Sequence, residues 1–107
     1  PQFTSTPVTT GKEGQAYTYN ITTTDPDLVD GDSLTITAPT LPGWLALTDN
    51  GDGTANLAGT PAVVQIGGHQ VSLKVTDKLG ASATQTFTIE VGAAQIEYPI
   101  YLPIISK

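Results

Sequence analysis

The chain contains no cysteine, no methionine and no arginine among its 107 residues, and these absences narrow the functions open to it. Without cysteine, disulfides, thiolate catalysis and thiolate metal sites are excluded. Only four lysines, spread along the sequence, stand against ten acidic residues, which gives a net charge of −6. Because phosphate neutralisation needs a basic patch, nucleic acid is not an expected partner. An acidic surface is consistent with a module that binds a cation or with one that is simply well solvated.

Long apolar runs and catalytic motifs are also missing. No stretch of 18 or more apolar residues is present, so no membrane insertion is predicted. The single histidine, His69, follows two glycines, and no serine lies in a Gly-x-Ser-x-Gly context. The acids lie in predicted turns and line no cleft, so glycoside hydrolysis is not expected. The chain begins at Pro1 and lacks methionine, which indicates a fragment or a processed product.

Alternation of apolar and polar residues is the main structural signal. Residues 17–21, 34–38, 71–75 and 87–91 alternate with a period of two, which predicts strands with one buried face. Turn-forming Gly, Pro, Asn and Asp separate them, and residues 49–53 predict a hairpin turn. Shorter strands are predicted at residues 3–8, 44–48 and 54–58. The sequence thus predicts an all-β, two-sheet Greek-key β-sandwich of about seven strands over residues 1–92.

The amino-acid composition changes after residue 92. Residues 93–107 are apolar and interrupted by two prolines, which exclude a continuous central strand. We predict an edge strand, a linker or an attachment segment. Because exposure of its apolar side chains is unfavourable, we expect it to pack on its own domain, to pair with another copy in self-association, or to dock elsewhere.

The segment from Asp25 to Asp32 is the most specific candidate for chemistry. It holds four carboxylates in eight residues, Asp25, Asp27, Asp30 and Asp32. Calcium takes six to eight oxygen ligands from flexible loops of this kind. The spacing does not match an EF-hand. The plain alternative is a solvated connection in which aspartates cap turns.

Several segments resemble a known family. The most specific are Pro42-Gly43-Trp44-Leu45 and Gly59-Thr60-Pro61, supported by Asp25-Pro26-Asp27 and Val75-Thr76-Asp77. Together they resemble the dystroglycan-type cadherin-like domains, also described as immunoglobulin (Ig) domains of bacterial surface proteins. The resemblance covers residues 1 to about 92 and implies an Ig-like, cadherin-like sandwich. Such domains occur as tandem modules of secreted or surface proteins, sometimes beside catalytic domains.

The resemblance also implies a set of calcium ligands. In cadherins, calcium lies between successive domains; Asp25 and Asp27 match the Asp-x-Asp loop and Asp77 matches a later aspartate. Glu13 matches an early glutamate that serves the opposite end of a cadherin domain. The acidic linker that normally follows the last strand is replaced by residues 91–94, so no site is expected at that end. The first candidate metal ligands are therefore Asp25, Asp27 and Asp77. Asp30, Asp32 and Glu13 are the less favoured candidates.

These observations together predict a non-catalytic, extracellular or cell-surface module of a secreted bacterial protein. Its expected role is calcium-dependent adhesion or spacing between neighbouring domains. One alternative is a structural spacer without calcium. Another is a carbohydrate-binding module accessory to an enzyme, which would present Tyr17, Trp44 or Tyr101 to a glycan. For Trp44, between Pro-Gly and Leu45, we favour a place against the core.

Overall fold

Alternating residues build the strands of this protein, whose computed structural model describes residues 1–25 and 33–94. In β3 (Tyr17–Thr24), Tyr17, Tyr19 and Ile21 are buried, and the residues between them are exposed. Such alternation turns one face of a strand to the core and the other to water. The other strands of the described residues are β1 (Gln2–Phe3), β2 (Thr10–Lys12), β4 (Leu34–Thr40), β5 (Ala46–Asp49), β6 (Thr54–Gly59), β7 (Gly67–Asp77) and β8 (Ser82–Gly92).

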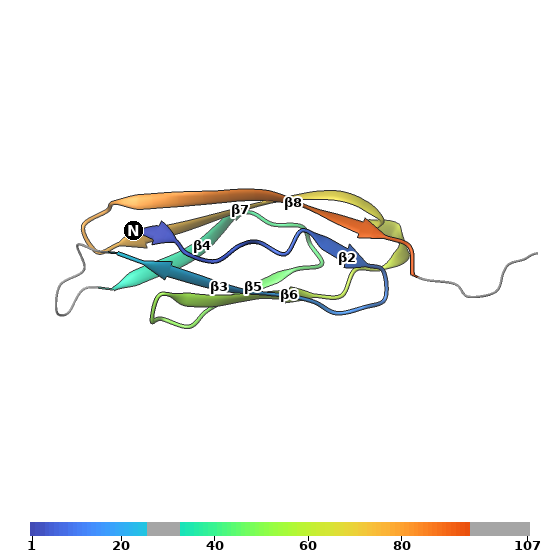
Figure 1. The fold of residues 1–107 in the computed structure, drawn as a ribbon, viewed down its shortest axis with the longest axis horizontal. Helices are drawn as coiled ribbons and strands as arrows, with labels where there is room; N and C mark the ends of the chain where they lie inside the picture. Colours follow the sequence, from blue (N-terminus) through green and yellow to red (C-terminus); the bar gives the residue numbers. More distant parts are fainter. Residues whose placement is uncertain (26–32, 95–107) are drawn as a thin grey trace, which may run out of the picture.

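The strands form two four-stranded sheets that lie face to face (Figure 1). One sheet has the order β1-β3-β6-β5 and the other β2-β8-β7-β4. Every pairing is antiparallel except that of β2 with β8. The predicted all-β, Ig-like sandwich is confirmed, with eight strands in the described residues where about seven were predicted.

The core lies between the sheets and draws on both. Ile21 and Leu57 from one sheet and Val71 and Leu73 from the other are 0% exposed. The rings of Tyr19 and Phe87 meet edge to face, with their centroids 5.7 Å apart. Because aromatic edges are positive and faces negative, this arrangement adds attraction to the burial of area.

The first strand differs from the prediction. The prediction of a strand over residues 3–8 is wrong, since β1 ends at Phe3 and a second short strand, β2, begins at Thr10. β1 pairs with β3 in one sheet, whereas β2 pairs with β8 in the other, so the chain crosses between the sheets. Pro7 lies in the crossing, where its missing N–H costs no ladder hydrogen bond.

The connections around β5 hold one correction and one confirmation. The strand predicted at residues 44–48 begins only at Ala46, because Leu45 N–H donates to the Pro42 carbonyl, 3.1 Å away, and closes a turn. The hairpin turn predicted at residues 49–53 is confirmed. Gly51 and Gly53 have φ of 85° and 88°, a region that favours glycine. β6 occupies the predicted residues and one more.

Further predictions concern the C-terminal tail, the aspartates after Asp25 and insertion into a membrane. Residues 95–107, most of the predicted tail, lie outside the described residues, as do Asp27, Asp30 and Asp32. Within residues 1–25 and 33–94, no helix has the length and apolar character needed to cross a membrane.

Burial of Tyr17 predicts a loss of stability at alkaline pH. The Tyr17 hydroxyl donates to the Val8 carbonyl, and burial, with a smaller contribution from repulsion by Tyr19, raises the pKa of Tyr17 to about 12. Since the unfolded side chain ionises near pH 10, the folded state holds its proton more tightly. The free energy of unfolding is therefore expected to be unaffected below pH 10 and to fall between pH 10 and 12.

Urea unfolding across this pH range, for the wild type and Tyr17→Phe, measures the effect. The variant is expected to lose this part of the pH dependence. Parallel declines in the two proteins would contradict the role of Tyr17.

Candidate metal site

The candidate site lies at one end of the sandwich, which we call the Pro1 end. β3 runs to Thr24 and leaves Asp25 directly after it, and β7 ends at Asp77 before a tight turn into β8. Pairing of Gln2 with Thr24 holds the start of the chain at the same end (Figure 1). Three segments far apart in the sequence therefore meet there.

Asp25 is a buried carboxylate beside a positive charge. Its side chain is 3% exposed, and Oδ2 lies 3.4 Å from the amino group of Pro1. Removing a carboxylate from water costs several kcal/mol unless a positive charge or hydrogen bonds compensate it. The position of Asp25 thus favours a cation next to it, whether an amino group or a metal ion.

Asp77 organises the turn between β7 and β8. Its Oδ1 accepts hydrogen bonds from the N–H groups of Leu79 and Ala81, each at 2.9 Å. Gly80, with φ of 94°, completes the turn by donating to the Asp77 carbonyl. Asp77 therefore caps this turn through Oδ1.

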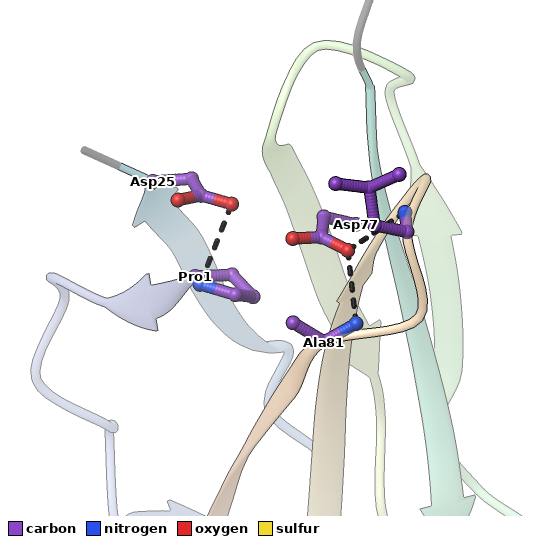
Figure 2. A network of polar contacts seen from close by, with 5 residues as sticks. Pro1, Asp25, Asp77 and Ala81 are labelled. Atoms are coloured by element: carbon purple, nitrogen blue, oxygen red, sulfur yellow. Dashed lines mark hydrogen bonds and ion pairs between the residues drawn. The ribbon is translucent and has the colours of Figure 1, made fainter. Parts of the chain in front are cut away.

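The two aspartates face each other. Figure 2 shows the second oxygen of Asp77 pointing toward Asp25, across the space between the end of β3 and the β7–β8 turn. The structure thus brings Asp25 and Asp77 to one end of the sandwich, as the family resemblance implies. Within the described residues, no three His, Asp or Glu side chains gather as a metal site, and Asp27, Asp30 and Asp32 lie outside those residues.

Glu13 lies at the other end of the sandwich, which we call the Gly92 end. Its N–H donates to the Gly92 carbonyl at 3.0 Å, and its Oε2 accepts from Ala94 N–H at 3.2 Å. Glu13 therefore fastens the end of β8 to the segment after β2. It shares no site with Asp25 and Asp77.

The aromatic candidates sit mainly in the interior. Tyr17 is 3% exposed, and the half-buried Trp44 packs against the core, as predicted. The Trp44 ring makes edge contacts with Tyr17 and His69, with centroids 6.0 Å and 5.6 Å away. His69 Nε2 also bonds to the Gln65 carbonyl, which gives this histidine a structural role. Tyr101 lies outside the described residues.

Sequence reasoning missed an open groove of about 450 Å³ beside β2 and the start of β3. Its lining includes the polar residues Lys12, Gln15 and Thr18, together with Tyr17. No carboxylate or histidine is among these described lining residues, so the groove lacks the acid pair that glycoside hydrolysis uses. β2 itself gave no sequence signal, and the groove depends on where β2 lies.

The carboxylate of Asp49 has a role that sequence reasoning also missed. Its Oδ2 accepts from the N–H of Ile36 in β4, 3.2 Å away, while Oδ1 accepts from Gly51 N–H in the turn. In the same turn, hydrogen bonds from Thr54 lower the pKa of Asp52. Asp49 and Asp52 are thus committed to the hairpin turn and, for Asp49, to linking the two sheets.

A family model supplies the assignment of the chain. The model described as "Putative Ig domain" (He_PIG) matches residues 1–92. The chain belongs to this Ig-domain family. The predicted family resemblance is confirmed, and these Ig-like domains are typically non-catalytic. No curated protein matches the chain.

Solved structures show similar domains inside longer enzymes. The endo-fucoidan hydrolase MfFcnA4 of glycoside hydrolase family 107 is 27% identical, with a TM-score of 0.64 over 82% of this chain and 12% of its own. A second such hydrolase, MfFcnA9, is 26% identical, with a TM-score of 0.54 over 78% and 14%. The Ig-like domain therefore corresponds to a small part of each enzyme.

One similar structure is a single domain that matches this chain over most of its length. The PKD domain of the KIAA 1837 protein aligns over 92% of both chains with a TM-score of 0.55. At 14% identity this likeness shows the fold alone.

In this Ig-like domain, the two segments that most specifically carry the resemblance touch each other. A Cβ added to Gly59, at the end of β6, would lie 2.0 Å from the carbonyl oxygen of Trp44. Only glycine fits such a close backbone approach. The Gly-Thr-Pro segment and the Pro-Gly-Trp-Leu turn are therefore two sides of one packing contact.

Proposed function

We propose that this Ig-like domain is a non-catalytic accessory module of a longer, secreted or surface-exposed protein. Its role is adhesion or spacing, and it binds calcium at the Pro1 end through Asp25, Asp27 and Asp77. A bound ion there would tie the module to the segment that precedes it and restrict motion at the junction. The likeness to parts of endo-fucoidan hydrolases supports the accessory role.

The observation that carries the calcium proposal is the approach of Asp25 and Asp77 from separate strands (Figure 2). Two carboxylates that face each other repel, and a divalent cation between them converts repulsion into attraction. Asp27 follows Asp25 by two residues, so covalent geometry keeps it within about 7 Å along the chain. The proposal therefore assigns its carboxylate to the same ion.

The amino group of Pro1 strengthens the electrostatic argument. It places a positive charge 3.4 Å from Asp25 Oδ2, and this charge compensates the negative charge of the buried carboxylate. When a residue precedes Pro1, the nitrogen becomes an uncharged amide. A calcium ion would then supply the positive charge at Asp25, so binding is expected to tighten.

NMR titration with calcium tests the site directly. We expect saturable shifts of the Asp25, Asp77, Leu79 and Ala81 amides, and saturation at lower calcium when one glycine is placed before Pro1. Asp25→Asn is expected to abolish the shifts, because it removes a ligand charge.

Glu90→Gln is the matched control, since it removes an exposed carboxylate from β8 away from the Pro1 end. It is expected to leave the titration unchanged. The absence of saturable shifts at these amides in millimolar calcium, in the chain with the added glycine, would exclude the site.

A calcium-independent spacer is the second candidate, because Asp77 Oδ1 already caps the turn and Asp25 already pairs with the amino group. Glycan binding by Tyr17 or Trp44 is less well supported, since Tyr17 is buried and Trp44 packs against the core.

A further inference from the structure

An exposed apolar surface lies at the Gly92 end, away from the candidate calcium site. It consists of Val63, Val64 and Ile66, which are 63%, 81% and 44% exposed, and we call it the Val63 patch. These side chains lie on the connection between β6 and β7, partly in a 3-10 turn, η1 (Val63–Gln65). Their clustering on one short connection distinguishes them from single exposed apolar residues, which need no explanation.

The Val63 patch is held in place by hydrogen bonds. Ile66 N–H donates to the Val63 carbonyl at 3.2 Å, and Gln65 Oε1 accepts from Ala62 N–H at 2.7 Å. His69 Nε2 bonds to the Gln65 carbonyl and ties the turn to β7. The apolar side chains are therefore presented outward by an ordered turn.

The chain leaves the sandwich beside the patch. Gly67, next to Ile66, pairs with Val91 near the end of β8, and Gly14 N–H donates to the Pro61 carbonyl at 2.8 Å. Glu13 holds Ala94 through its Oε2. Figure 1 shows the β6–β7 connection and the end of β8 at the same end of the molecule. The residues after Ala94 thus start within a few residues' reach of the patch.

These residues have the composition to cover it. A 13-residue stretch, 95–107, contains only two side chains that are charged at neutral pH, Glu97 and Lys107, and seven large apolar ones. One extended residue spans about 3.3–3.6 Å, so a few residues after Ala94 suffice to reach the Val63 patch. Closing so short a loop costs little entropy. The apolar members are Ile96, Tyr98, Ile100, Tyr101, Leu102, Ile104 and Ile105.

From this juxtaposition we infer that residues 95–107 dock on the Val63 patch of their own chain. Docking removes apolar surface of both partners from water, which is favourable roughly in proportion to the area buried. Pro99 and Pro103 do not oppose it, because contact through side chains needs no continuous backbone ladder.

Paramagnetic broadening in NMR tests the docking, because the chain has no native cysteine to compete for a label. A nitroxide attached through Ser106→Cys is expected to reduce the amide intensities of Val63, Val64 and Ile66 at least twofold. The amide of Leu79, in the turn at the Pro1 end, should keep its intensity. In the Val63→Ser, Val64→Ser variant, broadening at Ile66 should disappear, whereas the control Leu79→Ser, which alters a side chain 90% exposed, should preserve it.

Mixing distinguishes docking within one chain from docking between chains. Isotope-labelled chain without nitroxide is mixed with nitroxide-labelled chain of natural isotope abundance. No broadening in the mixture supports docking within one chain. Broadening in the mixture as strong as in the singly labelled sample would overturn it in favour of exchange between copies. Absence of broadening in both samples, or broadening that survives Val63→Ser, Val64→Ser with a folded spectrum, would also overturn it.

Discussion

A Gly59→Ala variant is expected to lose about 3 kcal/mol or more of folding stability. The added methyl carbon would lie 2.0 Å from the Trp44 carbonyl oxygen and 3.1 Å from Leu45 Cα. Both obstacles are backbone, so relief requires β6 to move away from the turn that precedes β5. Urea unfolding of the variant and the wild type measures the difference.

Gly43→Ala is the matched control for this prediction. Gly43 lies in the same turn as Trp44, and nothing is within 4 Å of an added Cβ. Its effect is expected to stay within about 0.5 kcal/mol. Similar losses at Gly59 and Gly43 would show that the close approach of β6 to Trp44 is not what stabilises this corner.

A Leu57→Ala variant is expected to lose about 2–5 kcal/mol, because it leaves a cavity at the centre of the core. Leu57 is 0% exposed and pairs with Tyr19 and Leu47 in the neighbouring strands. For a domain of about 100 residues, this corresponds to a fall of roughly 10 °C or more in Tm.

Leu79→Ala removes the same atoms from a side chain that is 90% exposed. It is expected to change stability by less than about 0.5 kcal/mol. Thermal unfolding of the two variants compares them directly. Equal Tm values for Leu57→Ala and Leu79→Ala would contradict the assignment of the core.

The long strands could be predicted because their sequences record which face is buried. In β3, β7 and β8, apolar residues recur at every second position, and the structure buries those residues, Val71, Leu73 and Ile89 among them. A period of two has no other common explanation in a threonine-rich chain. The hairpin turn after β5 was predictable for a related reason, since Asn-Gly and Asp-Gly tolerate positive φ.

The short strands were harder because their pairing partners are distant in the sequence. β2 has the sequence Thr-Gly-Lys and is a strand only because it pairs with β8, so no local sequence pattern predicts it. The same limit applies to the contact of Gly59 with Trp44. Neither residue shows in the sequence that the other lies against it.

The candidate site was predictable only through the family resemblance. Alternation and turn signals place Asp25 after one strand and Asp77 after another, but they do not say that the two strands end at the same end of the sandwich. That depends on sheet order, which the resemblance supplied. The capping of the turn by Asp77 follows the general preference of aspartate for such positions, whereas the pairing of Asp25 with the amino group of Pro1 needed the structure.

The most direct test of the proposed function is thermal unfolding in about 10 mM calcium and in chelator, for the chain with one glycine before Pro1. If the dissociation constant lies at about 10⁻⁴ to 10⁻³ M, the range of extracellular calcium modules, calcium should stabilise the domain by about 1.4–2.7 kcal/mol. Tm should then rise by on the order of 10 °C, and this rise should vanish in an Asp25→Ala, Asp27→Ala variant. Equal Tm values in calcium and chelator, or a rise that persists in the double variant, would contradict calcium binding at the Pro1 end.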